Sequence, residues 1–287
     1  MSAKKVHMRE PNFSESQLQQ AVNTELIRKV VRTRGDWVFA HVPSLVAEFD
    51  LGWDVGFYFP WLSNPPSPDD EGCNLFLQYK LSGELTSAGA REWSTWKSPY
   101  FRFKIPHSTR TKTGTFIDDY HQWVCLNKLA AKSYPTFYVT NATLFKADVQ
   151  SQYSAGTLLM HVPALDVRKV SGRHKHVTFK PDSSHFVLHS EEESSAKVML
   201  SQVLARVEQS DNLPIRETVE RLVADLHELP RSDESWNSDL ARLTDSANNP
   251  VPPLLRSWGQ YFQIANFVRK HLDVHLLWVP NSRRADP

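Results

Sequence analysis

The N-terminal part of the chain carries one clear helical pattern. Apolar residues recur every fourth position between residues 14 and 35, namely Leu18, Val22, Leu26 and Val30. Ser14 precedes this pattern as a typical helix-start residue, and Gly35 follows it after basic residues in the last turns. Glu25 stands seven residues after Leu18, so we expect it at the edge of the apolar face. Residues 1–14 are polar and predict a flexible N-terminus.

Shorter segments that follow have the apolar and aromatic content of strands. They cover residues 37–42, 54–59, 75–80, 100–105 and 136–145. Residues 63–72 predict a loop, residues 86–96 a short helix, and residues 118–132 a longer helix. The order helix, strands, helix, strand predicts an α/β fold with a mixed sheet flanked by helices.

The pattern changes after about residue 150. Three short strand-like segments come first, at residues 161–170, 174–179 and 185–190. A helical pattern then covers 194–229, polar residues and prolines interrupt it over 232–253, and a last helix (254–272) leads into a final strand (274–280). We therefore expect a core at residues 15–150 and an appended region at residues 151–287 that is mixed and then mainly helical, in contact with DNA or a partner.

Composition narrows the class of protein. Of 287 residues, 40% are hydrophobic and 23% are charged, as in an ordinary globular protein, and the net charge of +1 confines any nucleic-acid surface to a local patch. Two cysteines are too few for a disulfide framework. Neither a signal peptide nor a membrane-spanning apolar run is visible, so we expect a cytoplasmic protein without membrane contact.

Polar residues at the end of one strand suggest chemistry. Side chains two apart on a strand share a face, so Gln78 and Lys80 point to the same side of the segment 75–80. Asp54 begins the segment 54–59, which a loop joins to 75–80 as an expected hairpin partner. Asp50 is a second acid near that strand start, but Asp54 is favoured because it directly precedes the strand-like run. The candidate catalytic set is therefore Glu25 from the neighbouring helix with Asp54, Gln78 and Lys80.

This set suits phosphodiester hydrolysis with a divalent ion. Asp54 offers a hard oxygen ligand for Mg²⁺, and the amide oxygen of Gln78 or the carbonyl of Tyr79 adds a neutral one. Glu25 would hold a metal-bound water. The Lys80 ammonium would orient that water and stabilise charge that develops on the phosphate.

These residues resemble a known family, the PD-(D/E)XK nuclease superfamily in its QxK, Mrr-like restriction-endonuclease form. The matching motifs are NTELIRKV with Glu25, LGWDVGFYF with Asp54, and LFLQYK with Gln78, Tyr79 and Lys80, and the family order of elements is followed over residues 15–145. The resemblance implies a restriction-endonuclease-like core. It also implies a Mg²⁺- or Mn²⁺-dependent endonuclease acting on double-stranded DNA in bacterial anti-phage defence, as a homo-oligomer or with other defence proteins.

Two departures from the family keep alternatives open. Gln78 stands where an acid is usual, and Trp53 stands where a proline often precedes the aspartate. One rival is therefore a catalytically inactive scaffold or partner-binding subunit with a nuclease fold, and another is a nuclease directed at RNA. In the plainest alternative, Lys80 reaches solvent from a strand end and Glu25 is a surface acid.

Other polar clusters have weaker patterns. Basic residues are candidates for DNA phosphate contacts or are simply solvated, namely Arg102, Lys104, Arg110, Lys112, Arg173 and Lys175. Four histidines gather in one stretch, namely His174, His176, His185 and His189. The HxH pair at 174 and 176 can ligate zinc from one strand face, although no third ligand has a convincing spacing. His121 and Gln122 lie on the predicted helix 118–132 and face either the active site or solvent.

Overall fold

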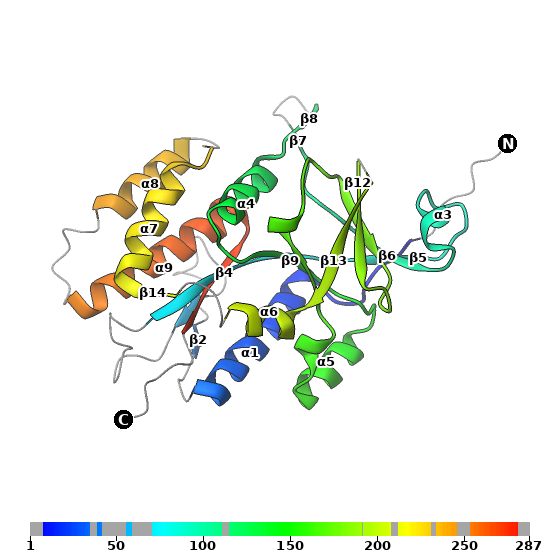
Figure 1. Ribbon diagram of the computed structural model, residues 1–287, viewed down its shortest axis with the longest axis horizontal. Coiled ribbons are helices and arrows are strands. Elements are labelled where there is room, and N and C mark those ends of the chain that lie inside the picture. Colours follow the sequence, from blue (N-terminus) through cyan, green and yellow to red (C-terminus); the bar gives the residue numbers. More distant parts are fainter. Residues whose placement is uncertain are drawn as a thin grey trace. The chain divides into compact units, whose positions relative to one another are not determined.

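The computed structural model describes residues 8–34, 39–41, 56–58, 71–110, 115–190, 192–207, 212–230, 234–245 and 253–280 (Figure 1). The chain divides into two compact units. Unit 1 comprises Met1–Glu25 and Gln78–Leu204, and unit 2 comprises Leu26–Leu77 and Ala205–Pro287. Three elements contribute residues to both units, namely helix α1 (Glu15–Arg34), strand β4 (Glu71–Lys80) and helix α6 (Leu200–Val207).

Helix α1 begins where the sequence predicts. Ser14 and Gln17 form a capping box, because the Gln17 amide N–H donates to Ser14 Oγ (3.1 Å) and the Ser14 N–H donates to Gln17 Oε1 (2.9 Å). Leu18, Val22 and Leu26 are buried as the helical period requires, which confirms the predicted face.

An 11-stranded sheet contains most of the described strands. Its order is β1-β5-β6-β11-β12-β13-β10-β9-β4-β14, with β15 paired to β4. The members outside β4 that belong to unit 1 are β1 (Met8–Arg9), β5 (Gly83–Leu85), β6 (Tyr100–Lys104), β9 (Thr136–Thr140), β10 (Pro163–Asp166), β11 (His176–Phe179), β12 (His185–His189) and β13 (Glu193–Met199). Two separate hairpins pair β2 (Phe39–His41) with β3 (Gly56–Tyr58) and β7 (Ser108–Arg110) with β8 (Phe116–Asp118).

The helices of unit 1 supply aromatic and aliphatic residues to its core. They are α3 (Trp93–Trp96), α4 (His121–Ala131), α5 (Lys146–Ala155), α6 (Leu200–Val207) and the 3-10 turns η1 (Leu158–Met160) and η2 (Val167–Lys169). Trp123 of α4 is buried and stacks on Tyr138 of β9 with ring centroids 5.8 Å apart. Helix α5 ends at Gly156 in the left-handed conformation that glycine adopts without steric cost.

Unit 2 packs three helices beside a short sheet. Helices α7 (Ile215–His227), α8 (Glu234–Asp245) and α9 (Pro253–Leu272) lie side by side (Figure 1). Strands β14 (Leu213–Pro214) and β15 (His275–Pro280) pair antiparallel with β4. Gly72 is required there, because a Cβ atom at this position would lie 2.1 Å from the indole ring of Trp278.

The structure confirms the α/β class, with eight α-helices among the described residues, and corrects two predicted elements. Residues 194–199 were expected to be helical but belong to β13, which is paired with β12 on one side and β10 on the other. The segment 232–253, expected to break the helical pattern, contains α8, whose Trp236 and Leu240 are buried. In both segments tertiary packing decides the conformation over the local pattern.

The compact units group the chain differently from the predicted parts 15–150 and 151–287. Residues 151–204 belong to unit 1, because strands β10 to β13 complete the sheet that contains β6 and β9. Met8 and Arg9, within the expected flexible terminus, form β1 on β5. Among the helices described, none is both long enough and apolar enough to cross a membrane.

Candidate functional site

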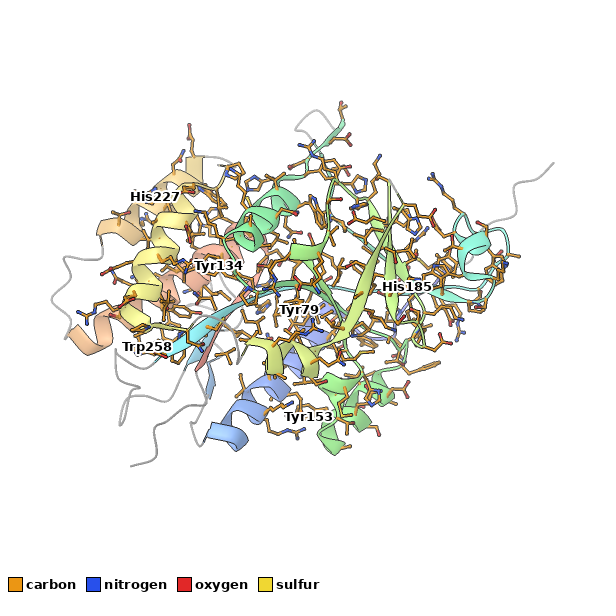
Figure 2. The ribbon with its side chains drawn as sticks, viewed as in Figure 1. Tyr79, Tyr134, Tyr153, His185, His227 and Trp258 are labelled. Atoms are coloured by element: carbon orange, nitrogen blue, oxygen red, sulfur yellow. The ribbon has the colours of Figure 1, made fainter. Side chains whose placement is uncertain are left out.

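Strand β4 carries the QxK motif in a buried position. Gln78 and Tyr79 are fully buried, and the Lys80 side chain at the end of the strand is 14% exposed (Tyr79 is labelled in Figure 2). Alternation along the strand places Asn74, Phe76, Gln78 and Lys80 on one face and Tyr79 on the other. Three of four side chains on that face are therefore polar, which is costly in a buried strand unless each has a partner.

Gln78 is held from two directions within unit 1. Its Oε1 accepts a hydrogen bond from Nε2 of Gln122 on α4 (3.1 Å), and its own Nε2 donates to the Tyr79 carbonyl (3.1 Å). Gln122 is one of the two helix residues whose orientation the sequence left open, and this contact places it beside the QxK motif. The Gln78 amide is therefore oriented by one contact to α4 and one to its own strand.

Helix α1 contacts the same end of β4 through two residues. The Tyr79 hydroxyl donates to Oδ1 of Asn23 (2.6 Å), and both residues are buried. The Lys80 ammonium lies 3.8 Å from Oε1 of Glu15. Tyr79 and Lys80 point to opposite faces of the strand, yet both reach α1, because the long side chain of a strand-terminal lysine can turn around the strand end.

The structure describes three of the four residues predicted for the catalytic set, Glu25, Gln78 and Lys80. Gln78 and Lys80 share one face of β4, and Glu25 is buried on α1, the helix that contacts Tyr79 and Lys80. Glu15, which pairs with Lys80, precedes Glu25 by ten residues. Ten residues correspond to a rise of about 15 Å along a helix, so Lys80 contacts α1 at Glu15, well before Glu25 along the helix. Asp54 and Asp50 lie outside the described residues, so their roles stay predictions.

Among the described residues, the expected pairing of segment 54–59 with segment 75–80 is not found. There β3 pairs with β2, while β4 pairs with β9, β14 and β15. Sequence reasoning missed Glu15. The signal was present, since Glu15 stands three residues before Leu18 and so lies on the same helical face.

The basic residues proposed for DNA contact separate into two kinds. Lys104, Arg173 and Lys175 are exposed near one end of β6 and β11, where the Ile105 N–H donates to the Lys175 carbonyl (3.0 Å). Arg102 instead points to a carboxylate, with Nη1 3.7 Å from Glu92 Oε2. Arg110 ends β7, and Lys112 lies outside the described residues. An exposed cationic group at this edge suits phosphate contacts, whereas Arg102 is engaged within the protein.

The four histidines do not act as the HxH pattern suggests. His174 is buried beside Glu193 (3.1 Å), and His185 stacks on Trp96. His176 and His189 are register partners on β11 and β12, and their rings stack with centroids 4.7 Å apart and planes 16° apart. The two histidine rings that this region brings together are therefore those of His176 and His189, from two strands, rather than those of His174 and His176.

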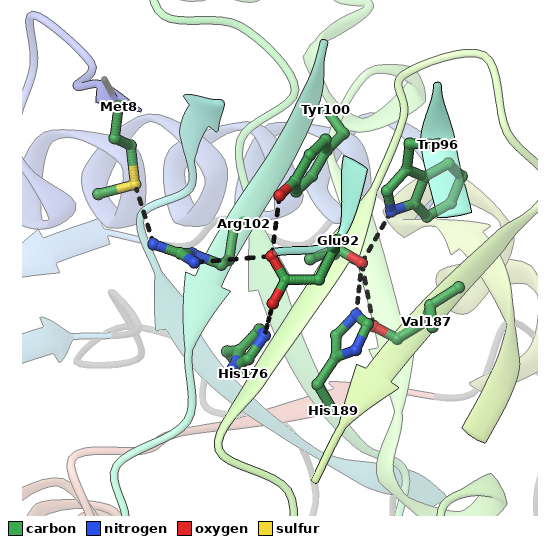
Figure 3. A network of polar contacts seen from close by, with 9 residues as sticks. Met8, Glu92, Trp96, Tyr100, Arg102, His176, Val187 and His189 are labelled. Atoms are coloured by element: carbon green, nitrogen blue, oxygen red, sulfur yellow. Dashed lines mark hydrogen bonds and ion pairs between the residues drawn. The ribbon is translucent and has the colours of Figure 1, made fainter. Parts of the chain in front are cut away.

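Glu92 completes a polar network around this pair (Figure 3). Its Oε1 lies 2.8 Å from His176 Nε2, and its Oε2 accepts from the Tyr100 hydroxyl (2.8 Å). Burial by itself would raise the pKa of the Glu92 carboxyl, but hydrogen bonds from Tyr100 and His176 and the charge of Arg102 lower that pKa below its ordinary value. Burial lowers the pKa of His176, and it lowers the pKa of His189 to about 4 with help from His176.

Comparison with protein-family models, curated proteins and solved structures finds no match to this chain. The likeness to PD-(D/E)XK nucleases therefore depends on the motif residues and the order of elements alone.

Proposed function

We propose that the protein is a metal-dependent endonuclease that hydrolyses DNA phosphodiester bonds. One observation carries this proposal: an amide and an ammonium occupy the same face at the end of a buried strand, and helices α1 and α4 both contact that motif. The cost of burying the charge of a lysine must be offset by a partner or a ligand, and Glu15 of α1 lies 3.8 Å from the Lys80 ammonium.

The order of elements supports the same function. Helix α1 is followed by the β2–β3 hairpin, the QxK strand β4, and later by α4 and β9, and β9 is the sheet neighbour of β4. This is the order that the family resemblance implies for residues 15–145. The strands β5 to β8 stand between the motif and α4, as an addition to that order.

The residues of the site have separate tasks in hydrolysis. Lys80 would donate to a nonbridging phosphate oxygen and stabilise the negative charge that grows as water attacks phosphorus and a sugar oxygen leaves. Glu25 would hold the attacking water. Gln122 fixes the Gln78 amide by its hydrogen bond at 3.1 Å and so orients Gln78 Oε1.

A divalent ion fits the oxygen donors of this motif. Amide, carbonyl and carboxylate oxygens are ligands that Mg²⁺ accepts. Asp54, Gln78 and the Tyr79 carbonyl would hold Mg²⁺ or Mn²⁺, which supplies Lewis-acid activation of water and phosphate when bound. The setting in anti-phage defence, with a second copy or other defence proteins, is part of the proposal and rests on the resemblance.

The second candidate is a nuclease-fold scaffold without activity. The hydrogen bonds of Gln78 favour it. Gln78 stands where the family usually has an acid, and both the oxygen and the nitrogen of its side-chain amide form hydrogen bonds inside the protein. It would bind partners of a defence complex and cut no nucleic acid.

A plasmid assay separates the two candidates. Supercoiled DNA is incubated with Mg²⁺ or Mn²⁺ and wild-type protein, Lys80→Ala, Asp54→Ala, or the control Lys146→Ala, which removes an exposed lysine of α5. The proposal predicts nicking or linearisation by wild type and control, and loss in the two site variants. Absence of wild-type cleavage would favour the scaffold, and equal cleavage by all four proteins would show that the QxK site does not perform the cleavage. A parallel reaction with RNA tests the choice of nucleic acid.

A further inference from the structure

A second polar cluster of unit 1 has the composition of a transition-metal site. Glu92, His176 and His189 each offer one ligand atom, and these atoms lie within 4.8 Å of one another. The three residues come from the segment before α3, from β11 and from β12, so that chain segments far apart in sequence converge on one point. We propose that Glu92, His176 and His189 bind a divalent transition-metal ion, for which zinc is the best match.

The chemistry of the donors selects the class of ion. Two imidazole nitrogens with one carboxylate oxygen form a ligand set that zinc uses with a water in the fourth position. Magnesium prefers oxygen ligands and would not favour two imidazoles. The ion proposed here is therefore chemically distinct from the one proposed for the QxK motif, and the two proposals stand independently.

The distances require only small adjustments. Ligand atoms of a tetrahedral zinc ion are about 3.4 Å apart, and Glu92 Oε1 and His176 Nε2 are already at 2.8 Å. The imidazoles of His176 and His189 are nearly parallel at a centroid distance of 4.7 Å. A tilt of the partly exposed rings would bring one nitrogen of each to the ion, while the strands themselves stay in register.

The surroundings hold the ligands in a suitable orientation. The two oxygens of Glu92 have different partners, because Oε2 faces Tyr100 (2.8 Å) and Arg102 (3.7 Å) whereas Oε1 faces His176 (Figure 3). Thr178 Oγ1 lies 2.8 Å from His189 Nε2 and fixes that ring. Such outer contacts commonly orient metal ligands and raise affinity.

The charge states of the cluster also suit a cation. An imidazole binds a metal ion in its neutral form and a carboxylate in its ionised form, and Glu92 supplies the one carboxylate of this ligand set. Arg102 opposes the ion by its charge, but its side chain is 25% exposed and contacts the carboxylate on the side away from His176.

Zinc binding by purified, chelator-treated protein tests this site. Isothermal titration with ZnCl₂ and the visible absorption of added Co²⁺ are measured for wild type, His189→Gln, Glu92→Gln and the control His185→Gln. His185 and His189 stand on the same strand, and His185 stacks on Trp96 instead of joining the cluster. The proposal predicts one ion per chain, affinity reduced at least about tenfold in the two cluster variants, and little change in the control. Lys80→Ala would bind zinc as wild type does, so failure of the nuclease proposal leaves this result unaffected.

Two outcomes would overturn the proposal: no binding beyond an adventitious ion, or equal affinity in wild type, His189→Gln and Glu92→Gln. Should the cluster variants fail to fold, zinc-edge X-ray absorption of the wild-type protein decides the question. A coordination shell of nitrogen and oxygen with two imidazoles supports the site. A coordination shell that contains sulfur would assign the ion to a cysteine, and a shell of oxygen alone would assign it to surface oxygen ligands. Either result would refute the proposal.

Discussion

Two polar clusters of unit 1 differ in how their charges are balanced. At the end of β4, Lys80 has a partly exposed carboxylate 3.8 Å away, and Gln78 forms hydrogen bonds with two neutral groups, the Gln122 amide and the Tyr79 carbonyl. Around Glu92, a carboxylate that is 4% exposed receives close contacts from a tyrosine, a histidine and an arginine. Under the two proposals, the ammonium of the first cluster stabilises charge on a phosphate, whereas the second cluster holds a carboxylate in a polar network and supplies two imidazoles to a metal ion.

The largest expected effect separates catalysis from stability. Lys80→Ala should slow DNA cleavage about 10²–10³-fold, the usual loss when one group that stabilises transition-state charge is removed. Its free energy of unfolding should change by less than about 1 kcal/mol, since the pair with Glu15 is partly exposed. Tyr100→Phe should cleave at the wild-type rate. Cleavage rate constants and urea unfolding measure both effects, and slow cleavage by Tyr100→Phe would erase the distinction between the clusters.

Zinc should stabilise the folded protein through the Glu92 cluster and not through the cluster at the end of β4. At a concentration 100 times the dissociation constant, a ligand that binds only the folded state adds about 2.7 kcal/mol to the free energy of unfolding. We expect a higher melting temperature for wild type and Lys80→Ala, and none of this increase for His189→Gln. Differential scanning calorimetry with and without ZnCl₂ measures the three melting temperatures. An equal increase in all three proteins would contradict zinc binding at the Glu92 cluster.

Two tyrosine hydroxyls provide a matched pair of deletions. Tyr79 and Tyr100 are both fully buried, but Tyr79 donates to the amide oxygen of Asn23 and Tyr100 donates to the Glu92 carboxylate. Tyr100→Phe should cost about 1.5–3 kcal/mol of stability and Tyr79→Phe about 1 kcal/mol, because hydrogen bonds to charged groups are the stronger ones. Urea denaturation gives both values, and the reverse order would show that the Glu92 charge is not retained in the folded protein.

The smallest effect concerns the orientation of Gln78. Gln122→Ala removes the hydrogen bond to Gln78 Oε1 and should cost about 1 kcal/mol of stability. Cleavage should fall by less than about tenfold, since Gln122 positions another residue. Gln150→Ala, an exposed glutamine of α5, is the control. A loss as large as that of Lys80→Ala would mean that Gln122 itself contacts the reacting groups.

Short-range patterns in the sequence predict the β4 cluster well. The four-residue period of α1, its capping serine and the alternation in β4 follow from neighbours in the chain, and they place Gln78 and Lys80 on one face of a buried strand. Glu15 was within reach of the same reasoning. The position of Asp54 was not, since it depends on how distant strands pair, and it lies outside the described residues.

The Glu92 cluster could not be predicted from local patterns. Glu92 is 84 residues from His176, and only the antiparallel pairing of β6 with β11 and of β11 with β12 brings the three ligands together. The histidine-rich stretch did mark the region, but strand register rather than HxH spacing selects His176 and His189. In β13 and α8 as well, pairing and packing between distant segments set the conformation.

A crystal structure with duplex DNA and Ca²⁺, an ion that occupies such sites without supporting cleavage, tests the central claim most directly. The nuclease account predicts a Ca²⁺ ion bound by Asp54 and Gln78 Oε1, and a backbone phosphate within hydrogen-bonding distance of Lys80 Nζ. DNA bound elsewhere, or a QxK end of β4 closed to both ion and phosphate with Asp54 far from Gln78, would contradict it.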